Sequence, residues 1–315
     1  MATKVLVWGL GKEFQNIYNL LLLNEECGYI DITAYVANDN RLQSLDGKKV
    51  ISSEMLFRTM RWGKEYEYII VTTEKYYEEI VEQGVRELEI PRRAFISGKI
   101  FRVPCFNWSR YLRIYESNIS IIAEACYGGK LSHELGLPFN SPFVNVRVGN
   151  EQEDYTGLLQ KLDYYMSVSP ELINKGKYRT MEWGGYEGRI DFPKLWYGDI
   201  MLHGFHFKSQ QDFFDVWEKR RKRFNNCNYL IMKILYTEKD VEEFIKLDCC
   251  NKLGIYYEDV NNENIVELKF EEKLREQYAY QFASYVFNSI GNGTFFESVD
   301  IFKLLCGEAG AKRKG

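Results

Sequence analysis

The chain has 315 residues, of which 45% are hydrophobic and 27% charged, and its 41 basic and 45 acidic side chains give a net charge of −4. This length favours two domains, and the near balance of charge excludes the positive field that would favour nucleic acid. The seven cysteines are odd in number and form no CxxC pair, which argues against a disulfide framework or a zinc ribbon.

No uninterrupted apolar run approaches the ~20 residues that a membrane-spanning helix needs. The first residues, MATKVLVWG, enter a strand-like run at once and lack the layout of a signal peptide. Together with the scattered cysteines, these features predict a soluble protein of a reducing cytoplasm, with no nucleic-acid partner and no membrane span.

Residues 1–114 are expected to form an N-terminal α/β domain. Strand-like runs at 4–8, 30–37 and 66–73 alternate with helical patterns, and a last strand follows at 92–97. Strands and helices that alternate at this spacing predict a parallel, doubly wound sheet of the Rossmann-like kind.

The turn after the first strand is the expected place for a ligand in this domain. Gly9 and Gly11 would let the backbone approach a phosphate at a helix N-terminus, and Asp39 stands at the end of the second strand. The dinucleotide fingerprint is incomplete, because Phe14 replaces its third glycine and Asp39 lies too far along the chain. Three interpretations stay open: a turn that needs glycine only for its shape, a site for a nucleotide or nucleotide sugar, and a hydride-transferring dehydrogenase.

Two segments of this domain, VLVWGLGKEFQNIYNLL and LDGKKVISSEML, together with the strand end at Asp39, carry a family resemblance. They are similar to the short Rossmann-like modules that precede bacterial sugar acyltransferases and some methyltransferases. The resemblance implies a nucleotide-type fold for residues 1–114.

Residues 115–307 are expected to form a second, three-layer α/β domain. It begins with another strand, glycine turn and helix, in which Gly128, Gly129 and Lys130 follow the strand end at Cys126. The glycines and the lysine could bring backbone amides and a cation to an anion, or the glycines could serve only a tight turn.

Cys126 stands where a strand end can present a nucleophile, although no activating base or cation is visible near it in the sequence. A small buried hydrophobe is the alternative role for this cysteine. Asn140 and Ser141 lead from the same unit into the next strand and complete the candidate ligand-binding residues of this region.

The stretch from Lys194 to Asn228 carries acid–base groups next to the densest cationic run of the chain. Asp199 precedes an apolar, strand-like run at 200–207 that holds His203 and His206. The two histidines of a regular strand at this spacing face opposite sides, so no metal site is predicted. One histidine is expected to act as a general base oriented by Asp199, and a histidine bonded to a backbone carbonyl is the alternative.

Residues 209–212 predict the start of a helix with a capping-box-like pattern, and the cations 219–223 fill its last turns. We expect one or two of Arg220, Arg221 and Arg223 to bind a diphosphate or carboxylate and the rest to be solvated. A wholly solvated helix end, whose cations interact favourably with the helix dipole, is the alternative.

Four segments keep their order over about residues 117–235: ACYGGKLSHELGLPFNSPF, LLQKLDYYMS, GDIMLHGFHFKS and WEKRRKRFNNCNYLI. Together they resemble a bacterial family of unknown function whose members are labelled exopolysaccharide-biosynthesis proteins. The resemblance implies a setting in cell-envelope or capsular polysaccharide assembly and implies no particular reaction. Glu124, Ala125 and Tyr127 depart from the family's form, so no role is carried over to these positions.

These patterns lead to one expected function and two alternatives. We expect a transferase of surface-glycan assembly that acts on a nucleotide-linked or phosphorylated sugar. The alternatives are a non-catalytic sugar-nucleotide-binding or scaffold protein of the same pathway, and an NAD-dependent oxidoreductase. The cofactor is left unspecified beyond a nucleotide or nucleotide sugar, the oligomeric state is open with a homodimer as one option, and residues 308–315 are expected to form a disordered tail.

Overall fold

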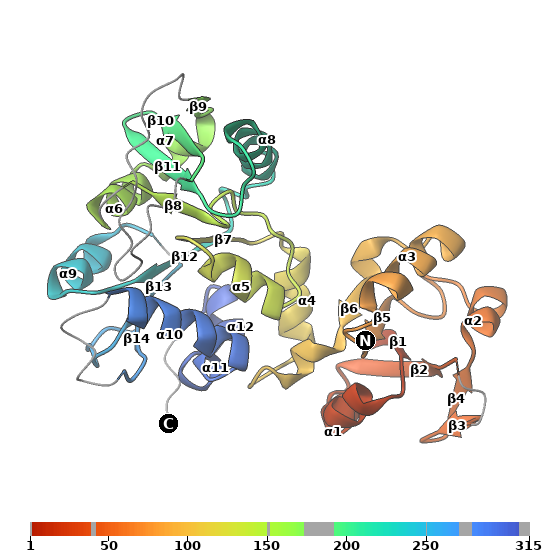
Figure 1. Ribbon diagram of the computed structural model, residues 1–315. Helices are drawn as coiled ribbons and strands as arrows, with labels where there is room; N and C mark the ends of the chain where they lie inside the picture. Colours follow the sequence, from red (N-terminus) through yellow and green to blue (C-terminus); the bar gives the residue numbers. More distant parts are fainter. Residues whose placement is uncertain are drawn as a thin grey trace. The chain divides into compact units, whose positions relative to one another are not determined.

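In the computed structural model, the chain folds into two compact units, Met1–Leu112 and Arg113–Gly315 (Figure 1). The structure describes residues 2–38, 42–149, 152–172, 192–249, 251–270 and 279–308. Asp39, a predicted ligand-binding residue, and residues 309–315 of the expected tail therefore lie outside the described residues.

The N-terminal unit is built on a six-stranded sheet with the strand order β3-β4-β2-β1-β5-β6. Its strands are β1 (Thr3–Trp8), β2 (Ile30–Val36), β3 (Ser44–Leu45), β4 (Lys48–Ile51), β5 (Tyr68–Val71) and β6 (Phe95–Ser97). All neighbours pair in parallel except β3 and β4. Later strands are added on both sides of β1, which is the doubly wound arrangement, so the predicted parallel α/β sheet is confirmed.

The helices of this unit are α1 (Lys12–Glu26), α2 (Ser53–Thr59), α3 (Tyr77–Leu88), the 3₁₀ turns η1 (Arg92–Ala94) and η2 (Gly98–Arg102), and the first part of α4 (Trp108–Glu116), which contains the boundary between the units. Figure 1 shows α1 and α3 on opposite faces of the sheet. Val5, Leu6 and Val7 of β1 are fully buried, as a strand covered by helices on both faces requires. The apolar run at the start of the chain therefore forms the centre of the sheet.

The second unit contains two sheets, a parallel one with the order β14-β13-β12-β7 and an antiparallel one with the order β8-β11-β10-β9. The strands are β7 (Ser120–Ala123), β8 (Val146–Val148), β9 (Glu171–Leu172), β10 (Lys194–Tyr197), β11 (Ile200–Gly204), β12 (Tyr229–Ile234), β13 (Lys252–Tyr256) and β14 (Ile265–Glu267). The strand predicted at 200–207 is present as β11 but ends earlier than expected. The chain turns after it, at His206, where φ is +66°.

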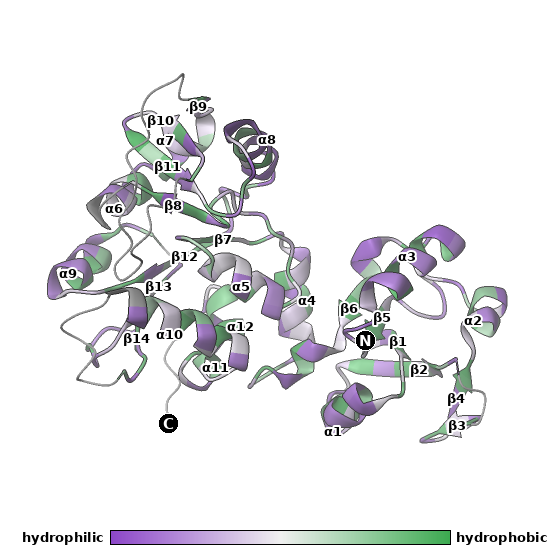
Figure 2. Cartoon of the chain, viewed as in Figure 1, coloured by the Kyte–Doolittle hydropathy of each residue, from purple (hydrophilic) through white to green (hydrophobic). Residues whose placement is uncertain are grey.

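The helices of the second unit are α5 (Tyr127–Glu134), α6 (Gln152–Gln160), α7 (Leu162–Ser167), α8 (Gln210–Arg221), α9 (Glu238–Lys246), α10 (Ala279–Asn292), α11 (Phe295–Ser298) and α12 (Ile301–Leu305). The predicted start of α8 is confirmed, because the Ser209 side chain accepts a hydrogen bond from the Asp212 amide. Phe213 and Trp217 are buried, while Figure 2 shows α8 as largely hydrophilic. Among the described helices, none is both long enough and apolar enough to cross a membrane.

Candidate functional site

The carboxyl ends of β1, β2 and β5 surround a hollow of about 780 Å³ in the N-terminal unit. From this edge the chain passes from β1 to β2 on one side and from β5 to β6 on the other, and such a switch point opens a crevice in doubly wound sheets. The lining residues come from the turn after β1, the end of β2 and one face of α3, and include Gly9, Gly11, Asn38, Tyr76, Glu79 and Gln83.

Gly9 and Gly11 have different roles in the turn between β1 and α1. Gly9 has a φ of +103°, and a Cβ there would lie 2.9 Å from the Thr72 hydroxyl oxygen, so this position requires glycine. The Thr72 hydroxyl donates a hydrogen bond to the Gly9 carbonyl at 2.6 Å and holds the turn against β5. A Cβ at Gly11 would meet nothing within 4 Å. Gly11 is the N-cap of α1 and no side chain caps this helix end, so its first amides have room for an external acceptor.

The other walls of the hollow combine apolar and polar side chains. Leu42 and Tyr76 offer apolar surface to a flat ring, and both are well exposed. Asn38, Glu79 and Gln83 bring amide and carboxylate groups that can bond hydroxyls. This mixture of apolar walls and a few polar groups is typical of a small-molecule site.

A second group of functional side chains lies at the end of β7 in the second unit. Glu124 follows this strand directly, and its side chain is only 17% exposed. Its Oε1 lies 4.0 Å from Nε of Arg147 on β8, and the backbone of Val148 also hydrogen-bonds the carboxylate. Burial nevertheless raises the pKa of Glu124 to about 7, because desolvation outweighs the attraction of Arg147. A carboxyl of this kind can both donate and accept a proton near neutral pH.

The backbone next to Glu124 adopts a conformation that residues with a Cβ rarely take. Ala125 has a φ of +57° and Asn145 a φ of +63°. The Ala125 amide donates to the Val146 carbonyl at 2.7 Å, and the Asn145 amide donates to the Ala125 carbonyl at 2.8 Å. These two bonds fix the position of Glu124, and strain of this kind concentrates at functional sites.

Three tyrosines of the second unit, Tyr127, Tyr155 and Tyr236, are electrostatically coupled to Glu124. Burial is the main cause that raises the pKa of each hydroxyl, and the negative charge of Glu124 is a further cause. The hydroxyls are therefore protonated at neutral pH and can act as donors. The Tyr155 hydroxyl is buried without a hydrogen-bond partner in the described part of the chain.

Sequence reasoning did not select Glu124, Arg147 or these tyrosines as site residues. The signal that could have found Glu124 is its place directly after a buried apolar strand, where the carboxyl edge of a parallel sheet lies. Its raised pKa depends on burial, which the sequence does not show.

The residues after β7 serve packing more than anion binding. Burial raises the pKa of the Cys126 thiol, which disfavours the thiolate that a nucleophile needs. A Cβ at Gly128 would lie 3.2 Å from the Ile121 carbonyl oxygen, and one at Gly129 would lie 2.7 Å from the Val144 side chain. The two glycines therefore let α5 approach β7 and residue 144 closely.

Lys130, Asn140 and Ser141 also have structural partners. The Lys130 ammonium lies 2.9 Å from the Glu134 carboxylate, one turn along α5. The Asn140 side-chain amide donates to the Ile119 carbonyl at 3.4 Å, and the Ser141 hydroxyl accepts from a backbone amide two residues further on at 3.3 Å. Their role as ligand-binding residues remains a prediction.

The two histidines of the central stretch lie in different environments. His203 on β11 is 1% exposed, whereas His206 lies beyond the strand and is exposed. Burial lowers the pKa of His203 to about 4, and the charges of Lys194 and Arg147 are the further causes. The His203 imidazole is therefore neutral and weakly basic at neutral pH, and Glu124 is better matched to general acid–base chemistry.

The sequence led us to expect that Asp199 orients a histidine, but it is not placed to orient His203, and for His206 this role stays a prediction. It lies exposed in the turn between β10 and β11, and its carboxylate accepts a hydrogen bond from the Tyr165 hydroxyl. This hydrogen bond lowers the pKa of Asp199. Cross-strand pairing sets His203 opposite Lys194, away from this turn. Among the described residues, no group of three or more His, Cys, Asp or Glu is placed to hold a metal ion.

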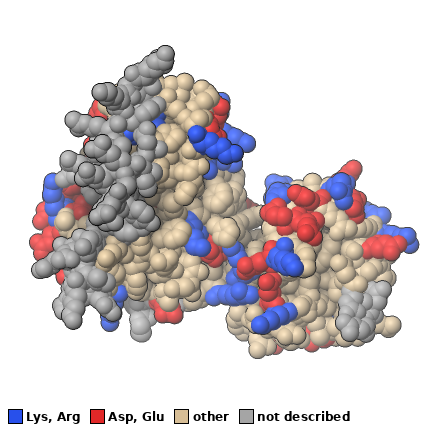
Figure 3. Space-filling model, in the orientation of Figure 1, with Lys and Arg blue, Asp and Glu red and all other residues tan. Residues whose placement is uncertain are grey.

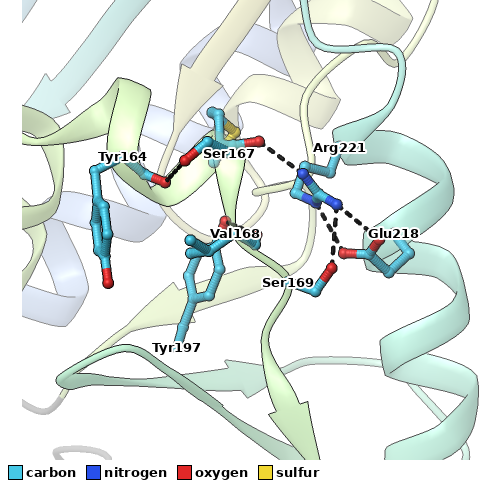
Figure 4. Close-up of polar contacts among 8 residues, drawn as sticks. Tyr164, Ser167, Val168, Ser169, Tyr197, Glu218 and Arg221 are labelled. Carbon is cyan, nitrogen blue, oxygen red and sulfur yellow. Dashed lines mark hydrogen bonds and ion pairs between the residues drawn. The ribbon is translucent and has the colours of Figure 1, made fainter.

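Arg221 is engaged within the protein, and its role as an anion ligand stays a prediction. Its Nε and Nη2 bond the two carboxylate oxygens of Glu218 at 2.8 and 2.9 Å. Its Nη1 donates to the Met166 carbonyl at 2.7 Å, and a further bond reaches the Ser169 hydroxyl at 3.2 Å (Figure 4). The guanidinium therefore joins α8 to the end of α7 and to the residues just after it.

Arg220 and Arg223 differ from Arg221. Arg220 donates to the Val144 carbonyl at 2.7 Å, and burial lowers its pKa. Arg223 is exposed just beyond the end of α8. Figure 3 shows basic side chains gathered over the region of α8, and acidic and basic side chains mixed over the visible face of the N-terminal unit. Of the three arginines, Arg223 is the most accessible to an external anion.

Comparisons with known proteins divide the chain in a similar way. Residues 1–96 match the family model described as C2185-like, N-terminal, and residues 97–288 match the model described as a domain of unknown function, DUF1919. An uncharacterized protein of Haemophilus influenzae is 27% identical over 144 residues, which cover 45% of this chain and 63% of that protein. The chain thus matches less than two thirds of the length of this relative. These descriptions name no ligand, reaction or pathway. Because the DUF1919 family model covers more than half of the chain, the protein belongs to the DUF1919 family.

Proposed function

We propose that this protein binds a nucleotide-linked sugar and acts as a transferase in the cytoplasmic assembly of a bacterial surface polysaccharide. The observation that carries the proposal is the hollow at the carboxyl ends of β1, β2 and β5, with its glycine turn and uncapped helix. The polysaccharide setting comes from the sequence resemblance over residues 117–235.

The lining of the hollow suits the parts of a nucleotide. A base would lie against Tyr76 and Leu42, and ribose hydroxyls would bond Glu79 or Asn38. The phosphates would accept hydrogen bonds from the first amides of α1, after Gly11, and interact with the positive end of the helix dipole.

The second unit supports the transfer part of the proposal. Glu124, with its pKa near 7, can deprotonate an acceptor hydroxyl or protonate a leaving oxygen. The Arg147 side chain next to it can stabilise negative charge on the reacting group.

The test is a thermal-shift titration of the full chain with nucleotide sugars, with NAD and coenzyme A as comparison ligands. A nucleotide sugar well above its Kd should raise the melting temperature by several degrees. Binding to the folded state adds about 2.7 kcal/mol to the free energy of unfolding when the free ligand concentration is about one hundred times Kd. No shift with any nucleotide sugar would overturn the proposal, and a shift with NAD alone would replace it with the oxidoreductase alternative.

The substitution Gly11→Ser sharpens this test. Serine is a favoured N-cap residue, so it should preserve or slightly raise the stability of α1. Its hydroxyl would accept a hydrogen bond from one of the first helix amides, which would then no longer be available to a ligand in the hollow. We expect the ligand-induced shift to be lost while the melting temperature without ligand is kept. Gly157→Ser is the matched control, because a Cβ at Gly157 also meets nothing within 4 Å.

A further inference from the structure

Three basic side chains form a row across the antiparallel sheet of the second unit. His203 on β11 lies directly opposite Lys194 on β10 and directly opposite Arg147 on β8. Residues directly opposite each other on antiparallel strands point to the same face, with Cβ atoms about 5 Å apart. The neighbouring row on the other face, Leu195, Leu202 and Val148, belongs to the hydrophobic core.

Burial changes along this row. Lys194 and His203 are each 1% exposed, whereas the Arg147 side chain is 24% exposed and the adjoining Glu124 side chain 17%. The row is therefore shielded from solvent at Lys194 and partly accessible to solvent at Arg147. Glu124 stands at the open end, with Oε1 4.0 Å from the Arg147 Nε.

His203 is the part of the row that the described protein leaves unsatisfied. Both of its ring nitrogens are buried without a hydrogen-bond partner in the described part of the chain. A buried polar atom without a partner is costly, so an imidazole with two such atoms points to a missing group. Because both cross-strand neighbours are cationic, an acceptor bearing negative charge would satisfy the ring N–H and also interact favourably with the cations.

We propose that Arg147, His203 and Lys194 form a binding site for a phosphate group, with Glu124 at its open end. The Arg147 guanidinium supplies a planar pair of donors, the Lys194 ammonium supplies a point charge, and His203 donates from its ring. Glu124 in its protonated form would add a fourth donor to a phosphate oxygen. The site lies in the second unit and does not depend on nucleotide binding in the N-terminal hollow.

The experiment is an NMR titration of the histidine side chains in the full-length protein. The chain has only three histidines, so selective isotope labelling yields few signals, and His133→Gln and His206→Gln assign them. The pH is varied in millimolar inorganic phosphate and in sodium chloride of equal ionic strength. A bound phosphate favours the protonated imidazole, so we expect phosphate to raise the pKa of His203 by about one unit or more.

Lys194→Met tests whether the row is responsible. It removes the buried cation with little change in volume, and the phosphate response of His203 should fall or vanish. Lys208→Met is the matched control, because Lys208 is an exposed cation of the same segment. If Lys194→Met does not fold, Arg147→Gln takes its place, since Arg147 is the more exposed member of the row.

Three outcomes would overturn the proposal. The pKa of His203 could be unaffected by phosphate in the wild-type protein, the response could persist in full in Lys194→Met or Arg147→Gln, or it could appear only at the exposed His133 and His206. A failed nucleotide-sugar titration would overturn the proposed function and leave this measurement intact.

Discussion

At the scale of single residues, Glu124 and His203 show how burial acts on acids and bases in opposite directions. Desolvation favours the neutral form of both groups, so it raises the pKa of Glu124 and lowers that of His203. At about pH 6, which lies between the ordinary and the shifted pKa of each group, both side chains are consequently largely uncharged. Stability should depend on pH through each of them, with opposite sign.

We predict that Glu124→Gln changes the pH dependence of stability. The pKa of Glu124 rises from 4.5 in the unfolded chain to about 7 in the folded protein, so its contribution to stability is complete below 4.5 and lost as the pH rises through 7. Glutamine has no such loss. Relative to wild type, the variant should gain about 2–3 kcal/mol in free energy of unfolding between about pH 5 and about pH 8.

Urea denaturation at the two pH values measures this difference directly. His203 acts in the opposite sense, because its lowered pKa makes stability complete above 6.5 and lost as the pH falls towards about 4. Comparing the variant with wild type cancels that contribution. Glu263→Gln, which removes an exposed carboxylate, is the control. An equal stability difference at both pH values would contradict the raised pKa of Glu124.

At the scale of elements, two neighbouring arginines, Arg220 and Arg221, bond the end of α8 to backbone carbonyls of other segments. The bonds from Arg221 to the Met166 carbonyl and the Ser169 hydroxyl join the end of α8 to the end of α7 and the residues after it, and the ion pair with Glu218 orients the guanidinium. The apolar side of α8 adds to this, because Trp217 meets Phe143 edge to face at 5.3 Å between ring centroids. The cationic run therefore combines two arginines bonded within the protein, Arg220 and Arg221, with exposed cations.

We predict that Arg221→Ala lowers the free energy of unfolding by about 2–3 kcal/mol, because it leaves a partly buried carboxylate and a carbonyl without their donor. Arg223→Ala should change it by less than about 0.5 kcal/mol, as is usual for an exposed side chain. Chemical denaturation of both variants gives the comparison. Equal effects would show that Arg221 has no special structural role.

At the scale of the whole molecule, each unit has its own core. One hydrophobic cluster of the N-terminal unit runs from Leu6 to Phe95 and contains no residue of the second unit. Trp108 and Tyr111 of α4 are buried, and Trp108 packs against Tyr68 of β5 with ring centroids 6.0 Å apart. The start of α4 thus belongs to the core of the N-terminal unit.

We predict that a fragment of residues 1–117, which retains all of α4, folds by itself. It should unfold in one cooperative transition and show the same nucleotide-sugar response as the full chain. A fragment ending at residue 106 should be much less stable, because it lacks the buried Trp108 and Tyr111. Circular dichroism melts of both fragments provide the measurement. A non-cooperative melt of the longer fragment would contradict an independent N-terminal unit.

Much of the fold could be predicted because it rests on local chemistry. The apolar run at β1 and the glycines after it specify a buried strand and its turn, and Ser209 specifies the start of α8. The antiparallel sheet of the second unit could not be predicted in the same way. β8, β10 and β11 are short, and although β10 and β11 are neighbours in the chain, the pairing of β11 with β8 joins segments that lie far apart.

The sequence by itself determined the α/β class, the parallel N-terminal sheet and the glycine turn at Gly9, since periodicity and backbone freedom are properties of neighbouring residues. Only the tertiary structure decided that Glu124 is buried beside Arg147, that His203 lies between two cations, and that Arg221 is bonded to the Met166 carbonyl. These facts depend on which distant segments meet and on how much water they exclude. Desolvation and charge at close range then set the chemistry of each side chain.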